Sequence, residues 1–215
     1  MRQRVNLIII GLLIGCSSTN SIKYADNALL SNIKNAVSLE TKLNSIDKTP
    51  LHLVGISTGI YPNKSNFILA TPRTFVRKED FFEKEVSYYY STSDSLVKVI
   101  LYQWDKRDEK SFETKNEKEQ KFKEFQRKWT TIEKSLRNEL GKPTFEEIES
   151  TKFPKGVIKE PKLNEDELWD TSKTPETSWT DKLKWENGGE TNAYLFMFGD
   201  NRTGYRQIRL AVYGE

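Results

Sequence analysis

The chain has 215 residues, of which 34 are basic and 31 are acidic, and its formal net charge is +3. This near balance, with no one-signed patch along the sequence, does not support nucleic acid as a partner. One histidine and one cysteine cannot form an intrachain disulfide and are too few for a transition-metal site, so we expect no metal and no cofactor.

The first 15 residues have the pattern of a secretory signal. Arg2 and Arg4 form a positive flank, and residues 5–14 are almost entirely apolar. Ten helical residues extend about 15 Å, roughly half of the hydrocarbon core of a bilayer, so this segment is too short to span it. The chain turns polar from Ser17 onwards. The segment is therefore either a removable signal or an uncleaved signal anchor.

Four residues at the end of this segment favour the removable signal. The stretch Leu13-Ile14-Gly15-Cys16 resembles the lipobox of bacterial lipoproteins. The resemblance covers residues 1–16 and implies that the Cys16 thiol receives a diacylglyceryl group. It also implies that a dedicated signal peptidase cuts between Gly15 and Cys16, and that the freed amino group is acylated, for example with palmitate. A thiolate is the nucleophile that lipidation needs, and a small residue before the cleavage site admits the protease.

The mature protein then begins at Cys16 and is held to a membrane by its lipid. Residues 16–23 comprise the lipidated cysteine and a short polar tether, and no other thiol remains in the exported chain. Removing Arg2 and Arg4 from the 34 basic residues leaves 32 against 31 acidic residues, a net charge of +1. In enterobacterial lipoproteins an aspartate after the cysteine favours the inner membrane, so Ser17 favours the outer membrane.

The first half of the remaining chain predicts a helix followed by strands. Apolar residues recur at spacings of three and four over residues 24–46, which predicts an N-terminal helix. Short apolar runs at 51–57 and 66–71 predict two strands. Residues 86–104 predict a hairpin, and its second strand, apolar on both faces, is expected at the centre of the sheet.

The second half predicts a long helix, an irregular stretch and a final meander. Apolar residues from Phe122 to Leu140 recur every three or four positions along one helical face, and Gly141 suits the C-cap. Residues 144–178 contain three prolines and predict a long irregular loop. Three consecutive antiparallel strands are predicted at 179–185, 192–198 and 205–213.

Residues 24–215 are therefore expected to form a single α+β domain. Its antiparallel sheet combines the hairpin with the C-terminal three-strand meander. The sheet packs on one long amphipathic helix, and the N-terminal helix is expected to pack on this larger body.

Three tryptophans provide the best candidate for a binding surface. Trp169 lies in the irregular loop, whereas Trp179 and Trp185 share one face of a predicted strand. Tryptophans beside a long loop can form a flat platform for sugars or peptides. The alternative is that Trp179 and Trp185 belong to the core while Trp169 fastens the loop to the domain.

Catalytic signatures are missing from the sequence of the predicted domain. The lone His52 lies in a predicted strand, and no G-x-S-x-G motif supports a serine hydrolase. Carboxylates are plentiful at 145–150 and 164–170. A glycosidase needs two of them held about 5 to 10 Å apart, and the sequence does not show such a pair.

These observations favour a lipid-anchored envelope protein that binds a protein, peptide or glycan partner and has no enzymatic activity. An immunity or inhibitor protein that blocks an incoming toxin is one form of this hypothesis. The alternative is a carboxylate-based hydrolase of cell-envelope polymers, supported by the acidic residues near the tryptophan-bearing loop.

The lipobox interpretation predicts the fate of a Cys16→Ser variant. Without the thiol, the variant receives no lipid and the lipoprotein signal peptidase leaves it uncut. In cells fed a clickable palmitate, the wild-type protein should incorporate the label and give a signal on a gel, whereas the variant should give none. Equal labelling of the two proteins would contradict the interpretation.

Overall fold

The computed structural model describes residues 24, 27–106, 115–152, 178–186, 188, 190–200 and 204–214. The predicted signal and tether, with Gly15 and Cys16, lie outside these residues. Trp169 and most of the predicted irregular loop also lie outside them. The lipobox assignment and the role of Trp169 therefore stay predictions.

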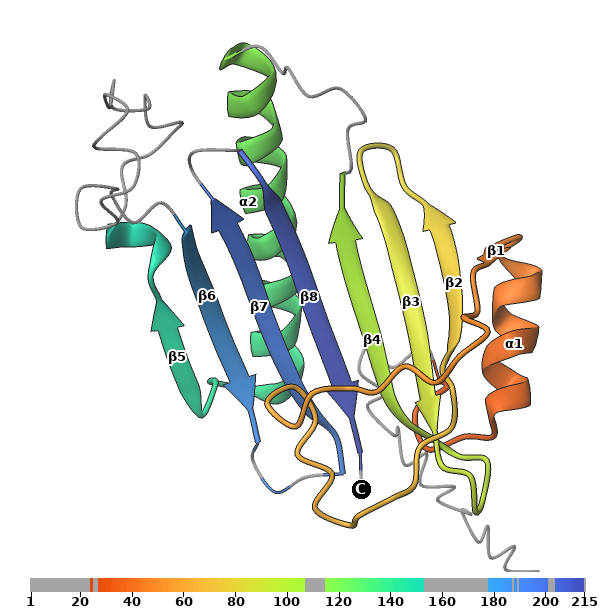
Figure 1. The fold of residues 1–215 in the computed structure, drawn as a ribbon. Helices are drawn as coiled ribbons and strands as arrows, with labels where there is room; N and C mark the ends of the chain where they lie inside the picture. Colours follow the sequence, from red (N-terminus) through yellow and green to blue (C-terminus); the bar gives the residue numbers. More distant parts are fainter. Residues whose placement is uncertain are drawn as a thin grey trace, which may run out of the picture.

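Among the described residues, eight strands form one antiparallel sheet, and together with two α-helices they confirm the α+β class (Figure 1). The order across the sheet is β1-β2-β3-β4-β8-β7-β6-β5, so β4 and β8 join the N-terminal strands to the C-terminal strands. The strands are β1 (Ile46–Asp47), β2 (Arg73–Lys78), β3 (Glu83–Tyr90), β4 (Val97–Asp105), β5 (Phe145–Ile148), β6 (Ser178–Trp185), β7 (Asn192–Asp200) and β8 (Arg206–Tyr213).

The predicted hairpin is confirmed as β3 and β4. The two strands pair with Val86 opposite Tyr102 and Tyr88 opposite Ile100, and residues 92–94 form the turn. Strand β4 lies between β3 and β8, and every one of its residues is buried or half-buried. Its apolar character on both faces therefore predicted its central position correctly.

The C-terminal part of the sheet has one strand more than the sequence predicted. Strands β6, β7 and β8 pair consecutively and antiparallel. Strand β5 pairs with β6, although residues 144–178 were expected to be irregular. Strand β5 has only four residues and carries Glu146 and Glu147 at its centre. Short, charged strands are typical of sheet edges, where they discourage pairing with other chains. Strand β5 was not predicted because such strands lack the apolar alternation by which strands are recognised in a sequence.

The long helix α2 (Lys115–Leu140) packs on one face of the sheet, which we call the first face (Figure 1). Phe125, Ile132 and Leu136 are completely buried in one apolar cluster with side chains of the central strands, and Trp129 is 7% exposed in the same cluster. Gly141 follows the helix with a φ of +80°, a left-handed conformation that few other residues adopt readily. The predicted apolar face and the predicted end of the helix are both confirmed.

Helix α1 (Ile33–Lys42) is much shorter than the predicted helix over 24–46. Asn27 and Leu30 have positive φ values of 53° and 56°, which an α-helix does not accommodate. The helix instead begins after Asn32, whose side chain accepts a hydrogen bond from the Lys34 backbone N–H at 3.0 Å. Helix α1 packs on the first face through Ala36, which is completely buried.

The segment between β1 and β2, residues 48–72, crosses the opposite face of the sheet (Figure 1). We call this segment the strap and the face that it crosses the second face. The strands predicted at 51–57 and 66–71 are wrong: the strap contains no regular strand, and Leu69 makes only an isolated bridge to Ser91. Positive φ values at Asn63 and Asn66 bend the chain out of an extended path.

The apolar residues of the strap cover the sheet rather than pair with it. Ile56, Ile60 and Leu69 pack against a second apolar cluster that includes Tyr89 and Tyr213. This cluster is built from the sheet residues that point away from the helices, because successive residues of a strand point to opposite faces. The sheet therefore has two cores, a large one under the helices and a smaller one under the strap.

The packing of α2 predicts a large loss of stability for Trp129→Ala. Removing a buried indole leaves a cavity and should lower the free energy of unfolding by about 3 to 5 kcal/mol. Urea unfolding of the soluble domain measures this change. The adjacent, exposed Thr130 provides the control, since Thr130→Ala should change stability by less than about 0.5 kcal/mol. Similar midpoints for the two variants would show that Trp129 does not support the fold.

Candidate functional site

Two of the three candidate tryptophans are core residues. Trp179 is 3% exposed and Trp185 is 1% exposed, and both belong to the cluster under the helices. The Trp185 Nε1–H donates to the carbonyl oxygen of Gly141 at 3.0 Å, which fastens the end of α2 to β6. Neither indole presents a face to a partner. The position of Trp169 lies outside the described residues.

Trp179 packs directly on the backbone of the neighbouring strand. A Cβ atom on Gly199 would lie 2.2 Å from the Trp179 ring, so β7 needs glycine at this position. The guanidinium carbon of Arg206 lies 5.1 Å from the Trp179 ring centroid and 5.2 Å from that of Phe122. Burial lowers the pKa of Arg206 to about 10, so it remains charged at neutral pH between two aromatic faces. These contacts give Trp179 a structural role.

Neither a metal site nor a catalytic histidine emerges from the described residues. No group of three or more His, Cys, Asp or Glu side chains among them could hold a metal ion. His52 is exposed on the strap and does not lie in the predicted strand. In the part of the chain that the structure describes, no helix combines the length and apolar character needed to cross a membrane.

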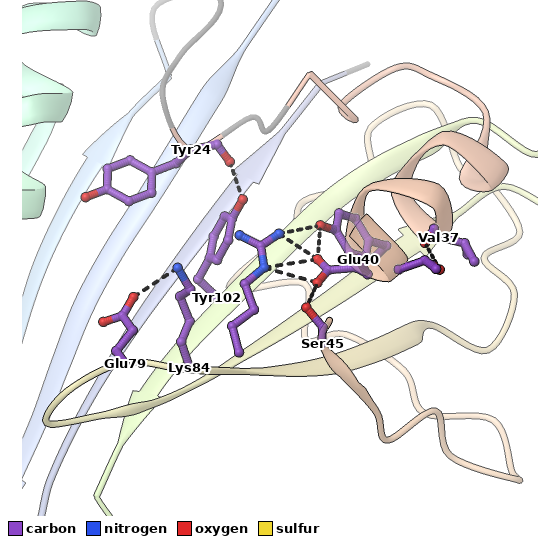
Figure 2. A network of polar contacts seen from close by, with 10 residues as sticks. Tyr24, Val37, Glu40, Ser45, Glu79, Lys84 and Tyr102 are labelled. Atoms are coloured by element: carbon purple, nitrogen blue, oxygen red, sulfur yellow. Dashed lines mark hydrogen bonds and ion pairs between the residues drawn. The ribbon is translucent and has the colours of Figure 1, made fainter. Parts of the chain in front are cut away.

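A buried polar cluster joins α1 to the sheet (Figure 2). The completely buried carboxylate of Glu40 accepts hydrogen bonds from Arg77 Nε at 3.1 Å, from the Tyr88 hydroxyl at 2.6 Å and from the Ser45 hydroxyl at 2.5 Å. Burial alone would raise the pKa of Glu40, but these hydrogen bonds and the charge of Arg77 outweigh it and hold the pKa below the usual 4.5. A carboxylate already saturated by three donors serves the fold rather than a ligand.

Glu149 and Asp181 are two interacting carboxylates, the type of residue that the hydrolase hypothesis requires. Asp181 accepts hydrogen bonds from the Ser150 backbone N–H at 2.8 Å and from its hydroxyl at 2.7 Å. Burial raises the pKa of Asp181, and the charge of Glu149 adds to the effect. Glu149 itself accepts the Thr180 backbone N–H at 2.7 Å. Both carboxylates therefore fix the start of the 3₁₀ helix η2 (Ser150–Lys152) against β6.

A hollow on the second face is the best candidate for a binding site. It lies between the strap and strands β2, β3, β4 and β8, and its volume is about 460 Å³. This volume is within the range of pockets that hold small ligands, about 300 to 1,000 Å³. The strap contributes a mainly apolar wall with Pro50, Val54, Ile56 and Ile60, and the sheet contributes a more polar floor with Thr74, Glu85, Ser87, Tyr89, Leu101, Gln103 and Arg209.

Neighbouring strands hold the polar groups of the floor in a row. Glu85 on β3 is opposite Gln103 on β4, which is opposite Arg209 on β8. Arg209 Nε donates to Gln103 Oε1 at 2.9 Å, and the guanidinium carbon lies 5.9 Å from the Phe196 ring centroid. Next to this row the Thr74 and Ser87 hydroxyls bond to each other at 2.9 Å.

The ionisable residues that line the hollow are Lys48, Glu85, Tyr89 and Arg209. Burial raises the pKa of Tyr89 and the charge of Glu85 raises it further, while Arg209 lowers it, so the phenol stays protonated at neutral pH. Glu85 is the one carboxylate among the described lining residues. The site was not predicted from the sequence because the residues that line the hollow form no sequence motif. The polar–apolar alternation of β8 places Arg209 on the second face, but no sequence signal indicates that β8 pairs with β4.

Compared with protein-family models, curated proteins and solved structures, the chain matches none of them.

The Glu40 cluster predicts how stability depends on pH. Because the folded state lowers the pKa of Glu40, its contribution is fully present above pH 4.5 and is lost as the pH falls through the lower folded value. Glu40→Gln removes the buried negative charge that Arg77, Tyr88 and Ser45 contact and should cost about 3 kcal/mol at neutral pH. The loss should shrink in acid, which urea unfolding at several pH values measures.

Glu124→Gln is the matched control for this prediction. Glu124 pairs with Arg127, whose side chain is 76% exposed, so its loss should cost less than about 1 kcal/mol. If the difference in unfolding free energy between Glu40→Gln and the wild type is the same at every pH, Glu40 does not titrate as the structure indicates.

Proposed function

We propose that the chain is a lipid-anchored protein of the bacterial cell envelope that binds a protein, peptide or glycan partner in the hollow and catalyses no reaction. The hollow is the observation that carries this proposal. Its volume, its apolar wall and its polar floor are the features that ligand sites share. An immunity or inhibitor protein that occupies a toxin through this face is one form of the proposal.

The anchoring part of the proposal rests on the lipobox at Leu13–Cys16. Tyr24, the first described residue, is eight positions after Cys16. Eight extended residues reach at most about 28 Å, so the lipid would keep the sheet close to the membrane surface. Ser17 after the cysteine favours the outer membrane. The partner would therefore be a component of the envelope or a molecule that arrives there.

The hydrolase alternative receives less support. Glycoside hydrolysis needs two carboxyl groups on either side of the scissile bond, whereas the hollow contributes Glu85 alone. Glu149 and Asp181 are occupied by hydrogen bonds to Thr180 and Ser150, and they do not line the hollow. Binding without chemistry is therefore the function that the arrangement supports best.

Two glycines of the strap allow a matched test of this proposal. Gly55 lines the hollow, and a Cβ atom added there meets nothing within 4 Å. Gly59 is also exposed but does not line the hollow, and neither residue has a positive φ. Gly55→Trp should place an indole at the hollow and weaken the partner at least about tenfold, whereas Gly59→Trp should bind as the wild type does.

Affinity capture from solubilised envelopes, with mass spectrometry of the eluate, identifies components that the wild type retains. The dissociation constant of each retained component is then measured for both variants, and their urea midpoints confirm that they fold. A partner that binds Gly55→Trp and Gly59→Trp with equal affinity would place the binding site outside the hollow. Release of a cleaved glycan or peptide during capture would favour the hydrolase alternative.

A further inference from the structure

We infer that the hollow recognises a single carboxylate attached to an apolar group and an amide N–H, the chemistry shared by the C-terminal residue of a peptide and by an N-acylated apolar amino acid. This inference rests on the proposed binding function and defines the class of ligand. The inference rests on three features of the hollow: the free hydrogen-bond donors of Arg209, the charges of the lining residues and the apolar wall of the strap.

Arg209 is held in place on the floor of the hollow but is not neutralised. The Nε–H is occupied by Gln103 Oε1 at 2.9 Å, and the ring of Phe196 lies 5.9 Å from the guanidinium carbon. Among the described residues, no carboxylate forms an ion pair with Arg209 and no acceptor bonds to its two terminal nitrogens. A guanidinium fixed at one edge and free at the other matches the two oxygens of a carboxylate.

The charges around the hollow suit one negative charge better than two. Lys48 and Arg209 contribute two positive charges to its lining, and Glu85 contributes one negative charge. Glu85 lies two strands from Arg209, on the far side of Gln103. A dianionic phosphate on Arg209 would be repelled by Glu85, whereas a monoanionic carboxylate is repelled less.

Glu85 also provides an acceptor for the rest of the ligand. No hydrogen-bond donor contacts its carboxylate among the described residues, so it can accept an amide N–H from a molecule whose carboxylate lies on Arg209. The Tyr89 hydroxyl adds a donor on the same floor. Burial raises the pKa of this phenol, so it retains its proton at neutral pH.

The wall of the hollow receives the apolar part of the ligand. Ile56 and Ile60 of the strap face the hollow together with Leu101 of β4, and all three are only partly buried. An aliphatic side chain between them would exclude water from both surfaces. The carboxylate on Arg209, the N–H on Glu85 and the side chain against the strap together describe an acylated apolar amino acid.

The test is isothermal titration of the full lipidated chain in detergent micelles with N-acetyl-leucine, its uncharged amide and inorganic phosphate. We expect N-acetyl-leucine to bind with a dissociation constant of about 1 mM, and the amide and phosphate to bind about tenfold more weakly. Arg209→Gln should remove the preference for the acid, and Arg209→Lys should retain a fraction of it. Lys182→Gln, which removes a cation of the same sheet face paired with Glu147, should change nothing.

A short peptide ending in leucine, with a free or an amidated C-terminus, distinguishes the two sources of the carboxylate. Tighter binding of the free-acid peptide than of N-acetyl-leucine identifies a peptide terminus, and equal binding identifies a small acid. Equal affinity for acid and amide, no binding up to about 10 mM, or no effect of Arg209→Gln would overturn the inference. Any of these results combined with a partner that Gly55→Trp excludes would leave the proposed function intact and refute only the ligand class.

Discussion

The rest of the structure depends on the pairing of β4 with β8. This contact joins the N-terminal strands to the C-terminal strands, and Arg209 and Gln103, which face each other across it, are 106 positions apart in the chain. Closing so long a loop costs conformational entropy before any contact compensates for it. Helix α2 covers the C-terminal side of this junction, and the floor of the hollow includes residues from both of its strands. The junction therefore determines both the stability of the sheet and the position of its candidate site.

The two faces of the sheet have different compositions because they meet different neighbours. The first face buries aromatic and aliphatic side chains under two helices, and its buried carboxylates Glu40 and Asp181 accept hydrogen bonds from neighbouring side chains. The second face is covered in part by the strap, and the polar side chains beside it include Arg209 and Glu85, which have unused hydrogen-bonding groups. Saturated polar groups stabilise a fold, whereas unsaturated ones at a hollow are available to a ligand.

The sequence predicted those elements whose periodicity is set by burial. Helix α2 buries one face against the sheet, strand β6 buries alternate residues, and strand β4 is buried or half-buried on both faces. These burial patterns give the apolar spacing from which the three elements were predicted. The strap could not, since Ile56 and Ile60 have the apolar content of a strand but cover the sheet from outside, where no ladder forms. Strand β5 carries Glu146 and Glu147 and shows no apolar alternation. The candidate site could not be predicted either, because the row Glu85–Gln103–Arg209 exists only once β4 and β8 pair.

The attachment of the strap determines how the hollow can change shape. Its backbone bonds to the sheet, within the described residues, lie near its ends: the Lys48 N–H donates to Thr74, the Ala70 N–H to Tyr90, and Ile68 accepts from Thr92. Between these points Tyr61 is buried in the cluster of the second face, and Ile56 and Ile60 pack against that cluster. Segments with few backbone bonds open at a lower free energy than the sheet beneath them. Opening of the strap would break these backbone bonds and expose the smaller core, whereas the pairing of the eight strands does not depend on them.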